Sequence, residues 1–214
     1  MVTVPTAGAG VPEVEIVADL GPVVERLERG LLAAAAIDIP IGLPPDHPRA
    51  ADREARRRLG PRRSSVFPAP MRPVLPASTY DEACRISRAA CGRAVSRQLF
   101  NILPKIREVD ALQSPALQDR LFEMHPEVSF AELGGAPMRA HKRTHQGRAE
   151  RVHLLRGAFP ELGTVADARL RGAHTDDVLD ALVGAWTARR HVGGHSIRLG
   201  GETDERGLRM EIIV

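Results

Sequence analysis

Four acidic residues, far apart in the chain, have the type and setting needed for hydrolytic chemistry at a phosphate. Asp38 follows the stretch 31–37, in which every residue is apolar. Apolar side chains on both faces predict a buried strand, and Pro40 predicts its end because proline cannot donate to a ladder. Asp38 therefore lies near the carboxyl end of a strand, where open α/β sheets bind ligands. It is either a metal-binding acid or a cap for the following loop.

The other three acids follow a second predicted strand and open a late helix. Residues 120–125 predict a core strand, and Glu127 comes just after it, as a ligand, a general base or a first-turn acid of a helix. Asp177 and Asp180 share one face of the helix predicted over 176–191. N-capping explains an acid at the start of that helix, but Asp180 lies a turn further in.

Carboxylates gathered from a strand end and a helix face would suit Mg²⁺ or Mn²⁺. Mg²⁺ prefers oxygen ligands, usually a few carboxylates with water and substrate phosphate. Two such ions stabilise the attacking water and the leaving oxygen of a phosphoryl displacement. The predicted metal ligands are therefore Asp38, Asp177 and Asp180, and Glu127 is a fourth catalytic acid.

Several cationic and hydroxyl side chains are candidates for holding phosphate. The alternative for the charged ones is a solvated helix face, and Arg151 has the same two interpretations. No Gly-x-Ser-x-Gly elbow surrounds the serine pair at 64–65, which argues against a serine hydrolase. The predicted substrate-binding residues are Arg63, Ser64, Lys105, Lys142, Arg143 and Arg148.

These motifs resemble a known family. Asp-x-x-Asp-Ala at the start of a late helix, with an acid at a core strand end, resembles the RNase H-like fold, nearest to the Holliday-junction resolvases. More narrowly, the chain resembles domain-of-unknown-function family 429, described as predicted RNase H-fold nucleases. The resemblance implies a divalent-metal nuclease site at the acids named above. The matching segments are 36–44, 63–68, 101–110, 123–130, 142–151 and 176–182.

The N-terminus departs from that family pattern. The resemblance implies a first strand ending in Gly-x-Asp-Gly, whose Asp is a central metal ligand. Residues 1–12 contain no acid, and the first one is Glu13. We therefore expect a loose segment over 1–12 and a sheet that lacks its first strand or strands. The sequence leaves the oligomeric state open, although an incomplete sheet edge would favour pairing with another chain, as in a homo-oligomer.

The elements that must position the acids follow an α/β pattern. A strand over 14–20, a helix over 22–29 and the Asp38 strand come first. Helices are expected over 48–59, from a Ser78 cap to Gly92, over 95–112 and over 144–157, with a last strand over 208–213. The stretch 61–77, with five prolines, predicts a structured loop. The pattern predicts one α/β domain over residues 13–214 with a helical insertion at about 45–118, and the resemblance implies that this domain is RNase H-like.

Composition narrows the function classes. The net charge of +3 is mild, and aromatic residues make up 3%, which argues against an extended base-stacking platform. Cys84 and Cys91 would lie about 10 Å apart on a helix, too far for a disulfide, so two buried thiols in the cytoplasm are expected.

Taken with the acids and the resemblance, the sequence predicts a nuclease acting on nucleic acid or a small phosphoester. The alternative is a binding protein on an inactive nuclease scaffold.

Overall fold

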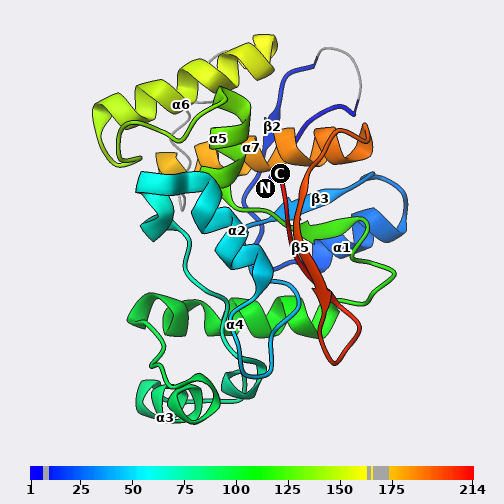
Figure 1. Ribbon diagram of the computed structural model, residues 1–214. Coiled ribbons are helices and arrows are strands. Elements are labelled where there is room, and N and C mark those ends of the chain that lie inside the picture. Colours follow the sequence, from blue (N-terminus) through cyan, green and yellow to red (C-terminus); the bar gives the residue numbers. More distant parts are fainter. Residues whose placement is uncertain (7–9, 163–164, 166–173) are drawn as a thin grey trace.

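A parallel pair of strands brings the two predicted strand ends together. A computed structural model of the chain describes residues 1–6, 10–162, 165 and 174–214. Strand β3 (Ala35–Ile37) pairs in parallel with β4 (Leu121–Glu123). A parallel bridge between Met124 and Ile213 joins β4 to β6 (Arg209–Ile213), and β6 pairs antiparallel with β5 (Arg198–Thr203). Strands therefore follow one another in the order β3, β4, β6, β5 (Figure 1).

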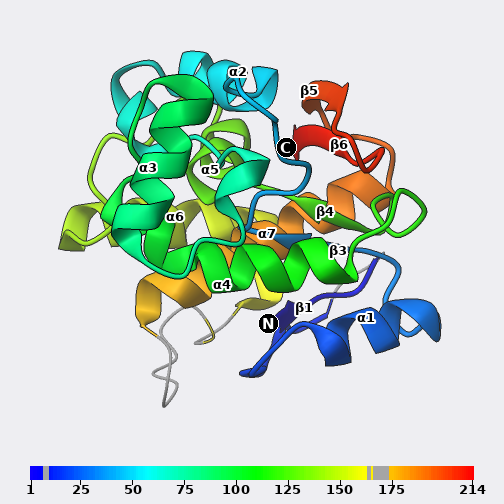
Figure 2. The same cartoon turned by 90° about the horizontal axis from the view of Figure 1, so that it is seen from below.

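Helices cover both faces of these strands, as the α/β prediction requires. Helices α1 (Gly21–Glu28) and α4 (Arg97–Leu112) pack against the face that carries Ile37. Helices α5 (Pro126–Gly134), α6 (His145–Ala158) and α7 (Thr175–Val192) share a core with Met124 on the other face. Figure 2 shows α4 in front of the strands and α7 behind them.

Small residues let α7 lie close to β3. A Cβ built at Gly184 would lie 3.8 Å from the Ala36 carbonyl oxygen and 3.5 Å from Cε of Met124. This close packing brings the first turns of α7 to the carboxyl end of β3. Among the described residues, no helix is long and apolar enough to cross a membrane.

The region between β3 and β4 holds three helices that pack in two places. Helix α2 (Ala50–Leu59) packs against β5 and β6. Helix α3 (Tyr80–Cys91) and α4 share a separate apolar cluster with the segment 69–77. Two short 3₁₀ helices, Gly60–Ser65 and Arg72–Val74, occur where a loop was expected. Prolines at their first turns suit a 3₁₀ start, because the missing N–H has no partner there.

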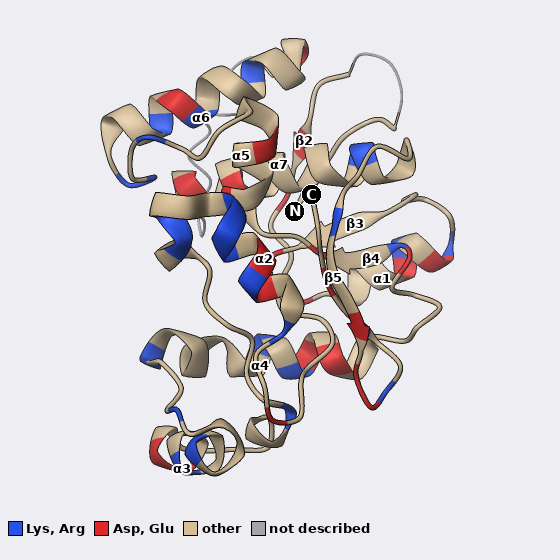
Figure 3. Cartoon of the chain, in the orientation of Figure 1, with Lys and Arg blue, Asp and Glu red and all other residues tan. Residues whose placement is uncertain are grey.

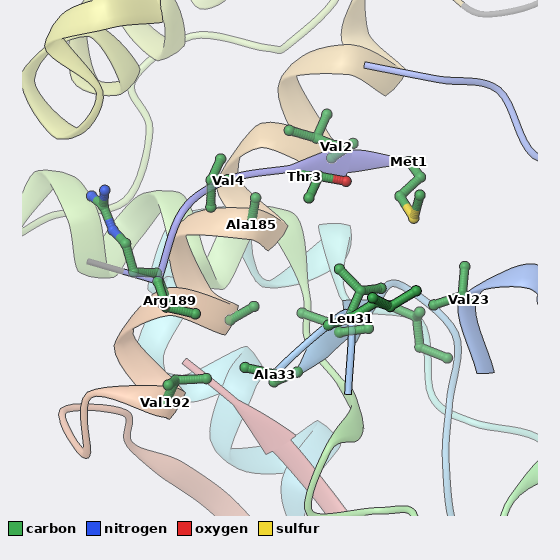
Figure 4. Close-up of a pocket in the computed structure, with 18 of the residues that line it drawn as sticks. Met1, Val2, Thr3, Val4, Val23, Leu31, Ala33, Ala185, Arg189 and Val192 are labelled. Atoms are coloured by element: carbon green, nitrogen blue, oxygen red, sulfur yellow. The ribbon is translucent and has the colours of Figure 1, made fainter. Parts of the chain in front are cut away.

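The N-terminal strands stand apart from the main sheet. Strands β1 (Val2–Thr3) and β2 (Glu13–Val14) pair with each other, and among the described residues with no other strand. Strand β1 packs on α7, and an apolar cavity of about 450 Å³ lies between it and β3. Figure 4 shows side chains from β1, α7 and the segment before β3 around this cavity. β3 is therefore an edge strand.

Three expectations, about a strand, a helix cap and a thiol, were wrong or incomplete, and one strand was not predicted. The strand expected over 14–20 pairs only at Glu13–Val14, because β1 offers it a two-residue partner. Thr79, not Ser78, caps α3, since the Thr79 hydroxyl accepts from the Glu82 amide at 3.2 Å. Strand β5 was not predicted, because glycines 200 and 201 interrupt its pattern. Of the two free thiols, Cys84 is buried and Cys91 is only half-buried.

Candidate functional site

Two adjoining cavities open at the carboxyl ends of β3 and β4, and Asp38 lines both. The larger measures about 550 Å³ and the smaller about 390 Å³. We call the two together the strand-end cleft. The larger cavity also contains Glu127 and the loop 141–143, and the smaller contains Asp177 and Asp180 from the start of α7. All four acids predicted from the sequence therefore line one or both of these two cavities, which share Asp38.

The loop after Asp38 is held in place by a tight turn. Gly42 has φ +72°, and a Cβ at this position would lie 2.8 Å from the Arg209 carbonyl oxygen of β6. The amide of Ile41 donates to Oε2 of Glu123 at 2.7 Å. Both contacts tie the loop to neighbouring strands, so the Asp38 side chain projects from a fixed backbone.

A buried ion-pair network beneath the cleft was missed by the sequence analysis. Arg49 is 1% exposed and contacts Asp52 at 2.6 Å and Glu123 at 2.7 Å. It also donates to the Ile41 carbonyl at 3.0 Å. Burial raises the pKa of Glu123, although the Arg49 guanidinium opposes this rise. Arg49 thus connects the start of α2, strand β4 and the loop after Asp38. In the sequence, the signal for this ion pair was an arginine placed just before the acidic first turn of a predicted helix.

Asp180 is paired with a lysine rather than standing free. Nζ of Lys142 lies 2.6 Å from Oδ2 of Asp180, and Oδ1 is buried with no hydrogen-bond partner among the described residues. Burial raises the pKa of Asp180, and Lys142 pulls it back. Burial also lowers the pKa of Lys142, but attraction from Asp180, Asp176 and Asp38 outweighs this, and the pKa of Lys142 is raised.

The turn that carries Lys142 depends on a glycine. Thr144 caps α6 by accepting from the Gly147 amide at 3.0 Å, and its hydroxyl donates to the His141 carbonyl at 2.8 Å. A Cβ at Gly147 would lie only 2.1 Å from that carbonyl oxygen. No side chain fits there, so Gly147 allows the loop 141–143 to approach α6 and presents Lys142 to Asp180.

Glu127 has one oxygen paired and one free. Its Oε1 accepts from Nη2 of Arg151 at 2.5 Å, while Oε2 is buried without a partner among the described residues. Arg151 is fully buried, so neither expected role, phosphate clamp or solvated charge, is correct. Gly147, Arg151 and Leu155 form a buried stripe at helical spacing on α6, and this was the signal that Arg151 faces inward.

Asp38 combines solvent access with strong electrostatic perturbation. The side chain of Asp38 is exposed to solvent in the cleft. Protein atoms near its carboxyl group still desolvate it in part, and this raises the pKa of Asp38 above its ordinary value. The charges of Asp180 and Glu123 raise the pKa further, and Lys142 lowers it. Acids with perturbed pKa values in a cleft are candidates for a functional site.

The remaining predicted residues differ in how close they lie to the acids. Asp177 lines the smaller cavity, but its Oδ2 accepts from the His174 amide at 2.9 Å and so caps α7. Lys105 lines the same cavity and donates to the Ala18 carbonyl at 3.2 Å. Ser64 and Arg143 line the larger cavity.

Two predicted phosphate ligands lie outside the cleft. Arg63 is exposed and does not line it, whereas its neighbour Arg62 does. Arg148 lines a different cavity, on α6, together with His145 and His153. The 3₁₀ turn that contains Arg62 and the helical turn that contains Arg148 decide which cavity each side chain faces. Spacing along the sequence does not show this.

Comparison with known proteins settles the family. The family model described as Protein of unknown function (DUF429) matches residues 2–205. The chain belongs to the DUF429 family. No curated protein and no solved structure gave a significant match. The resemblance drawn from the sequence motifs is confirmed at the level of this family.

The acids of this DUF429 protein fit a divalent ion in chemistry and number. Among the described residues, no three His, Cys, Asp or Glu side chains are grouped as a metal site. Mg²⁺, however, is usually held by only one or two protein carboxylates, with water and substrate phosphate. Asp38 and Asp180 supply two, and the partnerless Oδ1 of Asp180 is a buried oxygen without a cation. The ammonium of Lys142 already neutralises Oδ2 of the same carboxylate.

Proposed function

We propose that this DUF429 protein is a divalent-metal-dependent phosphodiester hydrolase of RNase H-like fold. The observation that carries the proposal is the meeting of Asp38 and Asp180 in one cleft. Asp38 extends from the end of a parallel strand and Asp180 from the first turns of a late helix, and the charge of Asp180 raises the electrostatic cost of ionising Asp38. Such a pair is the setting in which a cation and a phosphate bind together.

The fold supports the RNase H-like part of the proposal through its parallel core. β3, β4 and β6 are parallel neighbours, and α7 lies across the face next to β3. Acids at adjacent strand ends and on the helix that crosses them converge on one edge of the sheet. Ligand sites of open α/β sheets lie at this edge.

Each residue of the cleft has a role that follows from its partners. Asp38 and Asp180 would hold the metal, with Asp177 beside them at the start of α7. Oε2 of Glu127, buried and without a partner, would accept the proton of the attacking water. The contact with Arg151 keeps the Glu127 carboxylate oriented. When bound, the metal would supply Lewis-acid stabilisation of the phosphate charge.

Cationic side chains at the rim would bind the substrate's phosphate. Arg62 and Arg143 line the larger cavity beside Ser64, whose hydroxyl both donates and accepts hydrogen bonds. Lys142 lines the larger cavity with them and pairs with Asp180, so its ammonium is placed to contact a phosphate oxygen while it neutralises the acid. Guanidinium groups suit phosphate because their donors match it in pairs.

Hydrolysis of bis(p-nitrophenyl) phosphate with millimolar Mn²⁺ or Mg²⁺ tests the proposal. We expect metal-dependent turnover that is abolished by Asp38→Asn and Asp180→Asn. Glu127→Gln should lower kcat by about 10²–10⁴-fold, the usual contribution of a general base. The matched control is Asp46→Asn, an exposed acid that does not line the cleft. Turnover by Asp38→Asn equal to that of the natural chain would refute the proposal.

One observation favours a second candidate, a binding protein that does not hydrolyse its ligand. The Lys142 ammonium occupies the position on Asp180 that a metal would otherwise neutralise. An internal cation of this kind leaves a cleft that binds an anion without metal. If phosphate esters bind equally well with and without Mn²⁺ and are not turned over, this second function is the correct one.

A further inference from the structure

We propose that Phe67 is a stacking platform for one unpaired nucleobase, so that the substrate is a nucleotide or a single strand rather than a duplex. The inference rests on the proposed phosphodiester hydrolase, whose substrate class it names. Phe67 lines the larger cavity of the strand-end cleft, the one that contains Asp38 and Glu127. A base on its ring would therefore lie in the same cavity as the acids.

The exposure of Phe67 has no explanation in the packing of the protein. Its side chain is 45% exposed, and among the described residues it belongs to none of the apolar clusters. The other exposed large apolar side chains of these residues are aliphatic. An aromatic ring left in a polar cleft fits a planar ligand, because aromatic rings stack on nucleobases.

The backbone on both sides of Phe67 is held firmly. Val66 is buried, its amide bonds to the Arg63 carbonyl at 3.2 Å, and its carbonyl accepts from Arg56 at 2.7 Å. The amide of Ala69 donates to Oδ2 of Asp52 at 3.0 Å. Asp52 belongs to the buried Arg49 network, so the backbone that carries the Phe67 ring is anchored to the core of the site. A platform fixed before binding loses little entropy when a base stacks on it.

Groups around Phe67 match the other parts of a nucleotide. Gln98 lines the same cavity, and its amide has both a donor and an acceptor for a base edge. Arg62, Ser64 and Arg143 line it too and suit the phosphate. One cavity thus offers groups for the face of a base, the edge of the base and the phosphate. Its volume of about 550 Å³ is inside the usual range of roughly 300–1,000 Å³ for ligand pockets.

The charge distribution favours a single nucleotide unit over duplex nucleic acid. Positive and negative segments lie side by side along α2 and α6 in Figure 3, and the net charge is only +3. Duplex binding draws on many phosphate contacts from a continuous basic surface. Aromatic residues make up 3% of the chain, and among the described residues Phe67 is the one exposed Phe, Tyr or Trp side chain that lines this cleft. These features suit the recognition of one unpaired base better than the binding of a duplex.

Calorimetric binding of adenosine 5′-monophosphate and ribose 5-phosphate, without metal, tests the proposal. The two probes share a phosphate and differ in the base. We expect the natural chain to prefer the nucleotide by about 5- to 150-fold, the range that one base–aromatic stack supplies. Phe67→Ala should lose this preference without weakening ribose 5-phosphate. Phe67→Trp should keep it, and Leu112→Ala, which removes an exposed apolar side chain outside the cleft, should behave as the natural chain.

Equal binding of the two probes by the natural chain, or an unchanged nucleotide preference in folded Phe67→Ala, would overturn the stacking proposal. If Phe67→Ala does not fold, loss of the preference in Phe67→Leu decides the question. Metal-dependent cleavage of bis(p-nitrophenyl) phosphate without a base preference would leave the hydrolase standing and refute only Phe67. A base preference without any turnover would support the stacking role of Phe67 and refute the hydrolase. Faster cleavage of a single-stranded oligonucleotide than of its duplex is the expected result for the full reaction.

Discussion

Replacing Lys142 by methionine tests the electrostatics of the cleft directly. Methionine keeps most of the apolar stem and removes the charge that neutralises Asp180 at 2.6 Å. Removing one partner of a fully buried pair costs about 3–5 kcal/mol, and an exposed pair contributes about 0–1 kcal/mol. Here the side chains are 32% and 14% exposed, which places the cost between these limits, at about 1–2 kcal/mol. For a chain of this length that is a fall of roughly 2–8 °C in Tm.

The stability lost on replacing Lys142 should increase as pH rises. The pKa values of Asp38 and Asp180 are raised in the folded protein, and loss of Lys142 removes a charge that lowers both. An acid whose folded-state pKa is raised destabilises the fold once the pH exceeds its unfolded-state pKa, and the full cost is reached above its folded-state pKa. Lys142→Met should therefore match the natural chain below about pH 4, where carboxyls are protonated, and become less stable as pH rises through their folded-state pKa values.

Thermal unfolding of both proteins by circular dichroism at pH 4, 6 and 8 is the assay. Lys105→Met is the control, because Lys105 pairs with Glu108 on the surface with 55% of its side chain exposed. Added Mn²⁺ should restore the lost stability of Lys142→Met, since a ligand at 100 times its Kd contributes about 2.7 kcal/mol. A loss that is independent of pH, or no larger than that of Lys105→Met, would refute the reasoning.

Three further predictions concern the framework of the site. Arg49→Met leaves two buried carboxylates without their cation and should cost about 3–5 kcal/mol, measured as a fall in the urea midpoint. Gly147→Ala drives a methyl group into the His141 carbonyl and should lower both Tm and turnover. Gly157→Ala, in the same helix with open space around it, should be neutral or stabilising by up to about 1 kcal/mol. Asp38→Asn should abolish turnover yet raise Tm at pH 8, with no difference at pH 3, because it removes an acid whose pKa is raised.

Local signals were enough to predict most of the elements. Pro22 and Gly30 bracket α1, Gly92 ends α3, and the apolar period of 176–191 matches α7. These features act through neighbours within a turn or two, so the sequence alone contains the information. The strand end at Asp38 was predictable for the same reason, since an apolar run followed by proline has few other structures open to it.

Contacts between distant residues decided the rest. Lys142 and Asp180 are 38 positions apart and Arg49 and Glu123 are 74 apart, so no pattern within a segment could pair them. Whether Arg151 faces solvent or Glu127 depends on where α6 packs, and whether Phe67 is core or cleft depends on the network that holds its neighbours. The sequence by itself determined which acids end a strand or begin a helix. The tertiary structure decided which cation each acid meets, because charge pairing depends on distance in space and not on spacing along the chain.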